Sequence, residues 1–279
     1  MPCTACQSWT LVPRPTPERQ LAIHNDPNYF EHPYFRDRRT ARRALEHRCR
    51  QAFRRIGRAT DLASLRGQRL LDIGCDTGAF LRLAADEYGM HPVGIDVAGA
   101  AVRQANDDGI EAYETDLEHA SADLSDFALV TAIDLLEHVT EPAALLREAR
   151  RRLRPGGVLY IETPNVRSAI YRVGAVLCSV TGARPRPTFE RLFPLQHIQY
   201  FTAEALAHLA GECDLEVVSV DARKLPASHI GTSTPVKMGL GALQLVDSVS
   251  HDWVLLCAVL RRASMSQTDV SIHAAAGAA

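Results

Sequence analysis

The stretch from Leu70 to Phe80, LLDIGCDTGAF, decides the fold of this chain. Leu70 to Ile73 has the apolar pattern of a buried strand, Gly74 and Gly78 bracket a short turn, and apolar residues from Ala79 onward begin a helix. Glycine lets the backbone turn sharply and lets a ligand approach the main chain, while a helix N-terminus favours electron-rich groups. The stretch predicts a cofactor-binding strand–turn–helix unit, which several nucleotide-binding folds share.

Two further strands end in acidic residues. The segment VGID ends at Asp96, where a doubly wound fold places the carboxylate that holds a ribose diol. The segment YETD ends at Asp116, which is suited to accept a hydrogen bond from an adenine amino group. Capping of the following helix is the alternative role for each acid. Together with Asp72, three acids at three successive strand ends favour a ligand that contains adenosine.

The rest of the chain repeats the same alternation of short apolar runs and amphipathic helices, which is typical of βαβ units. We predict an α/β fold, a Rossmann-like, doubly wound, mostly parallel sheet of seven strands. The expected strands are residues 69–73, 91–96, 110–114, 127–133, 157–163, 215–221 and 253–260, and the expected helices are 78–88, 98–107, 141–153, 203–212 and 238–247. Pro155 to Gly157 should end the third of these helices and lead into the fifth strand.

Segments outside this alternation divide the chain. Residues 1–62 are expected to form an N-terminal arm, irregular over 1–34, and a helical cap from Phe35 to Arg58, and residues 63–263 the cofactor-binding domain. Residues 164–201 read as an irregular insertion after the fifth strand, of the kind that covers a substrate. The small and polar tail, residues 264–279, is expected to be disordered.

Composition sets limits on partners. The chain has 279 residues, 46% hydrophobic and 23% charged, with a net charge of -2, which gives no reason to expect nucleic acid or a membrane as a partner. Ten arginines lie between Phe35 and Arg58, so an RNA-binding face is the alternative to a solvated helix face. Seven cysteines without a regular framework, and no secretory signal pattern, predict a cytoplasmic protein. The oligomeric state stays open, with a homodimer as one option.

Six segments resemble the bacterial small-molecule branch of class I S-adenosylmethionine-dependent methyltransferases, the group that includes ubiquinone-pathway O-methyltransferases. They are LLDIGCDTGAFL, VGID, YETD, FALVTAIDLLEHV, LRPGGVLYIETPN and HIQYFTAEALAHL, within residues 65–222. The resemblance implies that Asp72 and Gly74 hold the methionine amino end, Asp96 the ribose, and Asp116 with Leu117 the adenine. The residues expected at the cofactor are Asp72, Gly74, Cys75, Asp76, Gly78, Asp96, Val97, Asp116, Leu117 and Asp134.

The loop departs from the pattern of these relatives at Asp76, where glycine is usual. Asp tolerates left-handed backbone better than most residues, so we expect the turn to survive and the cofactor to bind.

Methyl transfer from a sulfonium is an in-line displacement that needs alignment and, for a weak nucleophile, a base. His197, in PLQHIQYF, is the first candidate, and a hydrogen bond from the insertion to the body is its alternative role. Glu137 and His138 complete the predicted catalytic set. The segment around His197 is similar to the His-Glu-His stretch of sugar C-methyltransferases, but Leu195 and Gln196 replace the first two residues. We assign no metal, although relatives with an acid-x-x-Glu-His motif and a later His make a divalent cation at Asp134, Glu137, His138 and His197 an alternative.

The predicted function is transfer of a methyl group from S-adenosylmethionine to an O or N atom of a small metabolite, such as a sugar, a phenol or a natural-product intermediate. Cyclisation or other non-methylating chemistry and a cofactor-binding partner without catalysis are the alternatives. An NAD-dependent oxidoreductase would use Gly74, Asp76 and Ala79, but it leaves LEHV and LRPGG without a role.

Overall fold

The fold centres on a seven-stranded sheet, seen here in a computed structural model that describes residues 1–24, 42–182, 184, 189–190, 192–224 and 234–263. The strands are β2 (Arg69–Ile73), β3 (His91–Asp96), β4 (Ala112–Glu114), β5 (Phe127–Ile133), β6 (Leu153–Pro164), β8 (Leu215–Arg223) and β9 (Leu255–Arg262). Their order is β4-β3-β2-β5-β6-β9-β8, and β9 runs antiparallel to both of its neighbours. The predicted doubly wound, mostly parallel sheet is confirmed.

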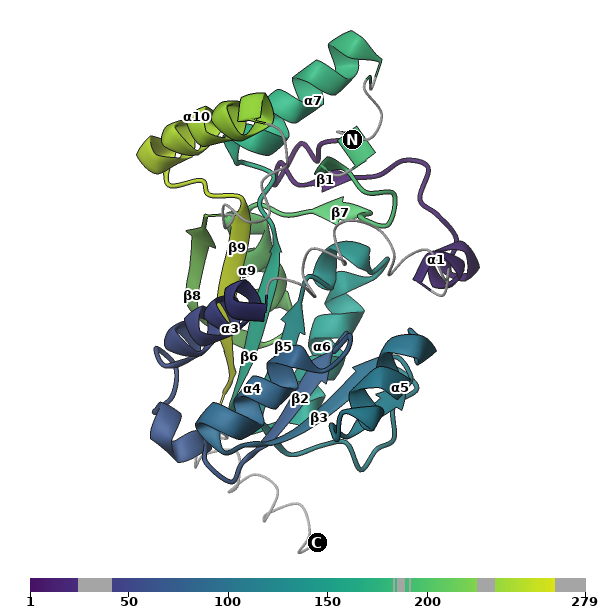
Figure 1. The fold of residues 1–279 in the computed structure, drawn as a ribbon, viewed down its shortest axis with the longest axis vertical. Helices are drawn as coiled ribbons and strands as arrows, with labels where there is room; N and C mark the ends of the chain where they lie inside the picture. The colour runs from purple at the N-terminus through teal and green to yellow at the C-terminus, as the bar shows by residue number, and fades with distance from the viewer. Residues whose placement is uncertain (25–41, 183, 185–188, 191, 225–233, 264–279) are drawn as a thin grey trace, which may run out of the picture.

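Helices cover both faces of this sheet (Figure 1). The helices are α3 (Arg42–Ile56), α4 (Ala79–Tyr88) and α5 (Gly99–Asp107) on one face, and α6 (Pro142–Arg152) and α9 (Ala203–Glu212) on the other. Because successive strand residues point to opposite faces, the adjacent residues Leu70 and Leu71, both fully buried, belong to different cores. The continuous apolar runs of the strands follow from this burial on both sides.

The sheet changes winding direction between β2 and β5. From β2 the chain continues to β3 and β4 on one side, and from β5 it continues to β6 on the other. In open α/β sheets ligands bind in the crevice beyond the carboxyl ends of the strands at such a switch point. The loop from Gly74 to Gly78 leaves β2 at this place.

The insertion after β6 is less irregular than predicted. It contains α7 (Ala169–Thr181), whose first turn is capped by the Ser168 side chain, which accepts a hydrogen bond from Tyr171 N. The helix has few charged residues, and Val176, Leu177 and Val180 all lie at its surface. Because apolar residues occur on its exposed face as well as on its buried face, the sequence analysis did not predict it. Figure 1 shows α7 beside α10 (Thr234–Ser250), at the end of the molecule beyond the sheet.

The N-terminal arm is also more regular than predicted. It contains β1 (Trp9–Thr10) and α1 (Pro17–His24), and β1 pairs antiparallel with β7 (Gln199–Tyr200). The fifth sheet strand likewise begins earlier than expected, at Leu153, two residues before Pro155. The predicted helix from Phe35 is seen from Arg42, and residues 35–41 and the tail 264–279 lie outside the described residues.

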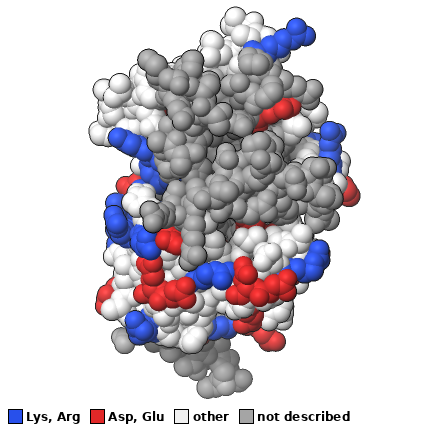
Figure 2. Space-filling view, in the orientation of Figure 1, with Lys and Arg blue, Asp and Glu red and all other residues white. Residues whose placement is uncertain are grey.

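Two arginines of the segment for which RNA binding was the alternative role contact acids of the protein itself. Arg50 forms an ion pair with Glu87, and Arg58 with Asp221. Basic and acidic side chains alternate along the lower half of the face drawn in Figure 2. Among the described residues, no helix has the length and apolar character needed to cross a membrane.

Close packing of Gly94 in β3 against Cys75, in the loop from Gly74 to Gly78, allows a prediction about stability. A Cβ at Gly94 would lie 2.5 Å from Cys75 Sγ and 2.8 Å from Leu81 Cδ1, inside the core. Gly94→Ala should therefore lower the free energy of unfolding by about 1–3 kcal/mol through overpacking. The matched control is Gly211→Ala in α9, where nothing lies within 4 Å and the change should stabilise the helix by about 0.5–1 kcal/mol. Urea unfolding measures both, and equal effects of the two changes would contradict the packing argument.

Candidate active site

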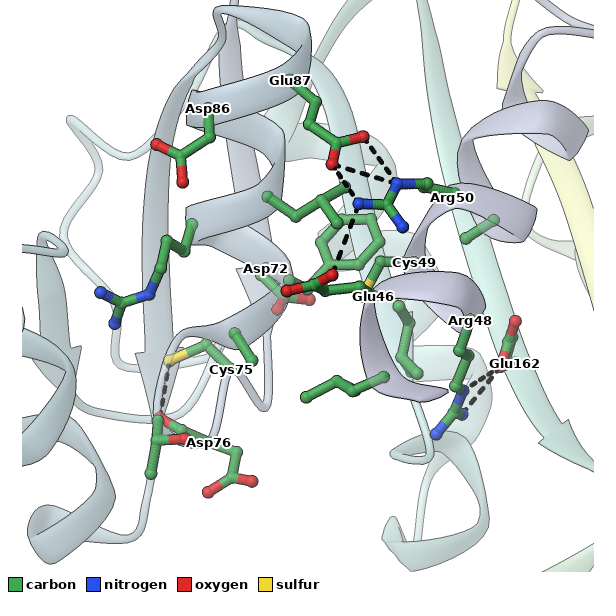
Figure 3. A pocket seen from close by; sticks show the side chains of 18 of the residues that line it. Glu46, Arg48, Cys49, Arg50, Asp72, Cys75, Asp76, Asp86, Glu87 and Glu162 are labelled. Atoms are coloured by element: carbon green, nitrogen blue, oxygen red, sulfur yellow. Dashed lines mark hydrogen bonds and ion pairs between the residues drawn. The ribbon is translucent and has the colours of Figure 1, made fainter. Parts of the chain in front are cut away.

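A pocket of about 550 Å³ lies between α3 and the loop that follows β2 (Figure 3). Its described lining is strongly acidic and includes Glu46, Asp72, Asp76, Asp86, Glu87, Asp108 and Glu162. Of the predicted cofactor residues, Asp72, Gly74, Cys75 and Asp76 line this pocket. The structure therefore places the beginning of the loop at a cavity large enough for part of a nucleoside-sized ligand.

Left-handed backbone shapes the loop. Gly74 and Gly78 both have φ of 75°, and Asp76 between them has φ of 50°. A Cβ at Gly74 would lie 3.3 Å from Leu135 Cδ1, a tight contact with the end of a flexible side chain, so the positive φ is the stronger reason for glycine here. The turn thus survives with Asp at position 76, as expected from the tolerance of Asp for this region.

Asp96 fixes the loop against the next strand. Its Oδ2 accepts a hydrogen bond from Asp76 N at 2.9 Å, and its Oδ1 accepts one from Ala98 N at 2.8 Å. A carboxylate oxygen has more than one acceptor site, so these bonds leave acceptor capacity for a diol. The predicted contact with ribose stays a prediction.

Asp72 is a buried acid of the pocket, only 4% exposed. Its Oδ1 accepts a hydrogen bond from the Thr131 hydroxyl at 2.5 Å. Burial, and the charges of Asp96 and Asp76, raise the pKa of Asp72 to about 7, although the hydrogen bond from Thr131 lowers it. A cationic group in the pocket would favour the ionised form of this carboxyl.

Arg48 was missed by the sequence analysis, where it was one of ten arginines in the predicted cap. Its Nε donates to Glu162 Oε2 at 2.8 Å, and its two terminal nitrogens donate to the two oxygens of Asp134, each at 2.7 Å. Arg223 donates to the same Glu162 oxygen at 2.7 Å. Although burial opposes ionisation, Arg48 and Arg223 lower the pKa of Glu162 to about 2. The sequence places Arg48 on the helix α3, but it gives no sign that the partners of this arginine are Glu162 and Asp134.

The remaining predicted cofactor residues have other contacts. The Cys75 side chain is buried against Gly94, and the Leu117 side chain lies in the core. Asp116 Oδ1 accepts a hydrogen bond from His119 N at 2.8 Å, so its carboxylate caps the next turn. Gly78, Val97 and Asp134 are not among the residues that line the pocket. Contacts of these residues with a cofactor stay predictions.

The three predicted catalytic residues meet in one cluster. Glu137 and His138 belong to a short 3-10 helix (Leu136–His138), and His197 comes from the end of the insertion. His197 Nε2 lies 4.0 Å from Glu137 Oε1, and the rings of His138 and His197 are 4.7 Å apart. Ligand atoms of all three lie within 4.8 Å of one another. Asp134, the fourth ligand of the alternative metal site, is instead bonded to Arg48.

Burial sets the proton affinity of Glu137. Its carboxyl is 1% exposed and accepts a hydrogen bond from the Thr163 hydroxyl at 2.8 Å. Burial and the charge of Asp134 raise the pKa of Glu137 to about 8, against the effects of Thr163 and Arg48. Such a perturbed carboxyl next to a histidine is typical of a site for proton transfer.

Main-chain bonds hold the segment that carries His197. Ile198 N donates to Glu137 O at 2.8 Å, and Leu11 N donates to Ile198 O at 2.8 Å. The N-terminal arm and the short 3-10 helix therefore clamp this segment from two sides. The His138 ring Nδ1 adds a hydrogen bond to the Gln196 carbonyl at 3.1 Å.

The donor set of the pocket fits the methionine part of S-adenosylmethionine. The loop offers close main-chain approach at Gly74, and Asp72 offers a buried carboxylate for an ammonium group. A sulfonium and an ammonium are both favoured by the acidic lining.

Several known proteins that are similar to this chain are methyltransferases. The family described as a methyltransferase domain matches residues 25–220. The ubiquinone biosynthesis O-methyltransferase of Paracidovorax citrulli (strain AAC00-1) is 31% identical over 145 residues, which cover 49% of this chain and 60% of that protein. The protein of the same name from Aromatoleum aromaticum (strain DSM 19018 / LMG 30748 / EbN1) is 30% identical over 171 residues, 57% of this chain and 68% of that protein.

A solved structure is similar in fold. The plantazolicin methyltransferase BpumL in complex with S-adenosylhomocysteine superposes with a TM-score of 0.53 at 20% identity, covering 88% of this chain and 96% of that chain. The family match spans well over half of the chain and includes the cofactor loop, the pocket and the histidine cluster. The chain therefore belongs to the class I S-adenosylmethionine-dependent methyltransferases, whose cofactor is S-adenosylmethionine.

Proposed function

We propose that this protein transfers the methyl group of S-adenosylmethionine to an oxygen or nitrogen atom of a small metabolite. The observation that carries the proposal is a buried carboxyl beside a histidine: Glu137 Oε1 lies 4.0 Å from His197 Nε2. The pair is connected to the pocket through Asp134, which precedes Glu137 by three residues and is hydrogen-bonded to the pocket residue Arg48. The curated relatives are named O-methyltransferases, which favours oxygen as the acceptor atom.

His197 is the proposed general base. When bound, the cofactor supplies an electrophilic methyl group, and the acceptor hydroxyl attacks its carbon as the bond to sulfur breaks. Nε2 of His197 takes the hydroxyl proton, and the nearby Glu137 carboxyl stabilises the imidazolium that forms. The clamp formed by Leu11 and the 3-10 helix keeps the imidazole beside Glu137.

The pocket residues are assigned by charge. Asp72 is proposed to hold the cofactor's ammonium group and Asp96 the ribose hydroxyls. Arg48, the buried arginine among the described pocket residues, is paired with Asp134 and Glu162, and its proposed role is to hold α3 against the sheet at the pocket. Asp76 adds a negative charge at the same loop, and we propose that it favours the cationic end of the cofactor.

A divalent cation is the second candidate for activating the acceptor. The observation that favours it is the group of ligand atoms from Glu137, His138 and His197, all within 4.8 Å. Two imidazoles and one carboxylate are a common ligand set for zinc and for other transition metals. In that case the cation would lower the pKa of a bound acceptor hydroxyl, and His197 would serve as ligand and not as base.

Asp72→Asn tests the cofactor assignment. The change keeps the shape of the side chain but removes the negative charge, so the dissociation constant of S-adenosylmethionine should rise about 10-fold or more. Because burial raises the pKa of Asp72 to about 7, binding by the original protein should tighten as the pH rises from about 6 to about 8.

Calorimetric titration at several pH values measures both effects, and the variant should show the smaller pH dependence. Urea unfolding of the variant checks that its fold is intact. Absence of binding by the original protein at about 1 mM cofactor would remove the cofactor assignment.

His197→Ala tests the base. The variant should bind S-adenosylmethionine as tightly as the original protein, while kcat falls by about 10²–10⁴. Release of S-adenosylhomocysteine is measured with a panel of phenols, sugar nucleotides and primary amines. Turnover without S-adenosylhomocysteine would instead indicate non-methylating chemistry.

A chelator separates the base from the cation. Under the base mechanism, treatment with EDTA leaves the rate unchanged. Loss of activity that a divalent cation restores would replace His197 as base by the cation at Glu137, His138 and His197.

A further inference from the structure

The hydroxyl of Tyr200 has no hydrogen-bond partner among the described residues, although the side chain is only 5% exposed. Leaving such a group unpaired costs about 1–3 kcal/mol, and a phenylalanine would avoid that cost. Tyr160 shows the usual arrangement, since its buried hydroxyl donates to Glu162 Oε1 at 2.6 Å. The Tyr200 hydroxyl thus has no visible role in holding this fold together.

Aromatic rings surround Tyr200 on its apolar side. The ring centroid of Tyr200 lies 5.4 Å from that of Tyr171, 6.0 Å from that of Phe193 and 6.5 Å from that of Trp9. These rings come from α7, from the end of the insertion and from β1, so the cluster joins three segments that are distant in sequence. Flat apolar surfaces of this kind suit a flat apolar part of a ligand.

Tyr200 lies beside the proposed catalytic cluster. The ring centroid of His197 lies 5.6 Å away, and β7 begins two residues after His197. Burial and the charge of Glu137 raise the pKa of Tyr200, so the hydroxyl keeps its proton and remains a donor at neutral pH. A hydrogen-bond donor without a partner therefore lies beside the residues that would receive the acceptor's proton.

We propose that the Tyr200 hydroxyl binds the methyl acceptor, donating a hydrogen bond to a polar atom of a flat, hydroxyl-bearing ring whose reacting oxygen faces His197. The inference rests on the proposed function and adds a residue that selects the substrate. The rings of Trp9, Tyr171 and Phe193 would contact the apolar part of the same ring. Phe193 is partly exposed and lies outside any helix or strand.

Tyr200→Phe separates binding from folding. The Tyr200 hydroxyl makes no hydrogen bond among the described residues, so the variant should melt at the same temperature as the original protein or higher. The control is Tyr160→Phe, which removes a buried hydrogen bond to Glu162 and should lower the melting temperature. A clear fall in the melting temperature of Tyr200→Phe would show that the hydroxyl has a structural partner and would overturn the inference.

Ligand binding is the second measurement. Protein saturated with S-adenosylhomocysteine is titrated with 4-nitrophenol, and Tyr200→Phe should bind it about 10-fold more weakly or worse. Tyr88→Phe, in α4 and outside the aromatic cluster, should bind it as the original protein does. Equal affinity of Tyr200→Phe and the original protein, or no binding to either, overturns the inference.

Turnover distinguishes this inference from the proposed function. With a phenol that the original protein methylates, Tyr200→Phe should raise KM more than it lowers kcat, with the affinity for S-adenosylmethionine unchanged. If no acceptor gives S-adenosylhomocysteine, the proposed function fails, and the 4-nitrophenol titration still decides the role of Tyr200. Unchanged kinetics in Tyr200→Phe count against the inference alone.

Discussion

One fully buried carboxylate, Glu162, and the two arginines that neutralise it connect the parts of this molecule. Arg48 reaches it from the N-terminal helix α3 and Arg223 from strand β8, while Glu162 itself belongs to the central strand β6. Removing one partner from such a group leaves an uncompensated buried charge, at a cost of about 3–5 kcal/mol. Because Arg48 also bonds to Asp134, the same interaction sets the distance between α3 and the end of β5, and with it the width of the cofactor pocket.

The balance of charge around the pocket follows from this arrangement. Glu162 is held ionised, whereas the equally buried Asp72 and Glu137 lack an arginine at hydrogen-bond distance among the described contacts, and their pKa values rise to about 7 and about 8. The two carboxyls with raised pKa values lie in different places: Asp72 lines the pocket, and Glu137 lies beside His197. One fold thus maintains a permanently charged acid for structure and two acids that are poised to exchange protons near neutral pH.

Most of the sheet could be predicted because its strands are buried on both faces and read as apolar runs between turn residues. The prediction for β2 and β3 agrees with the structure to the residue. The helix α7 and the pairing of β1 with β7 could not be predicted in the same way. An apolar helix without a polar face has no helical period to detect, and a strand of two residues acquires its partner from a segment 190 residues away.

The sequence by itself determined the order of strands and helices, the turn at Gly74 and Gly78, and the presence of acids at strand ends, because these depend on local periodicity and backbone conformation. Tertiary structure decided which acids are charged, which arginine of α3 pairs with Glu162, and that Trp9, Tyr171, Phe193 and Tyr200 form one cluster. Burial and charge pairing arise only when distant segments meet. For that reason the family could be recognised from the loop LLDIGCDTGAF, while the roles of Arg48 and Tyr200 required the folded chain.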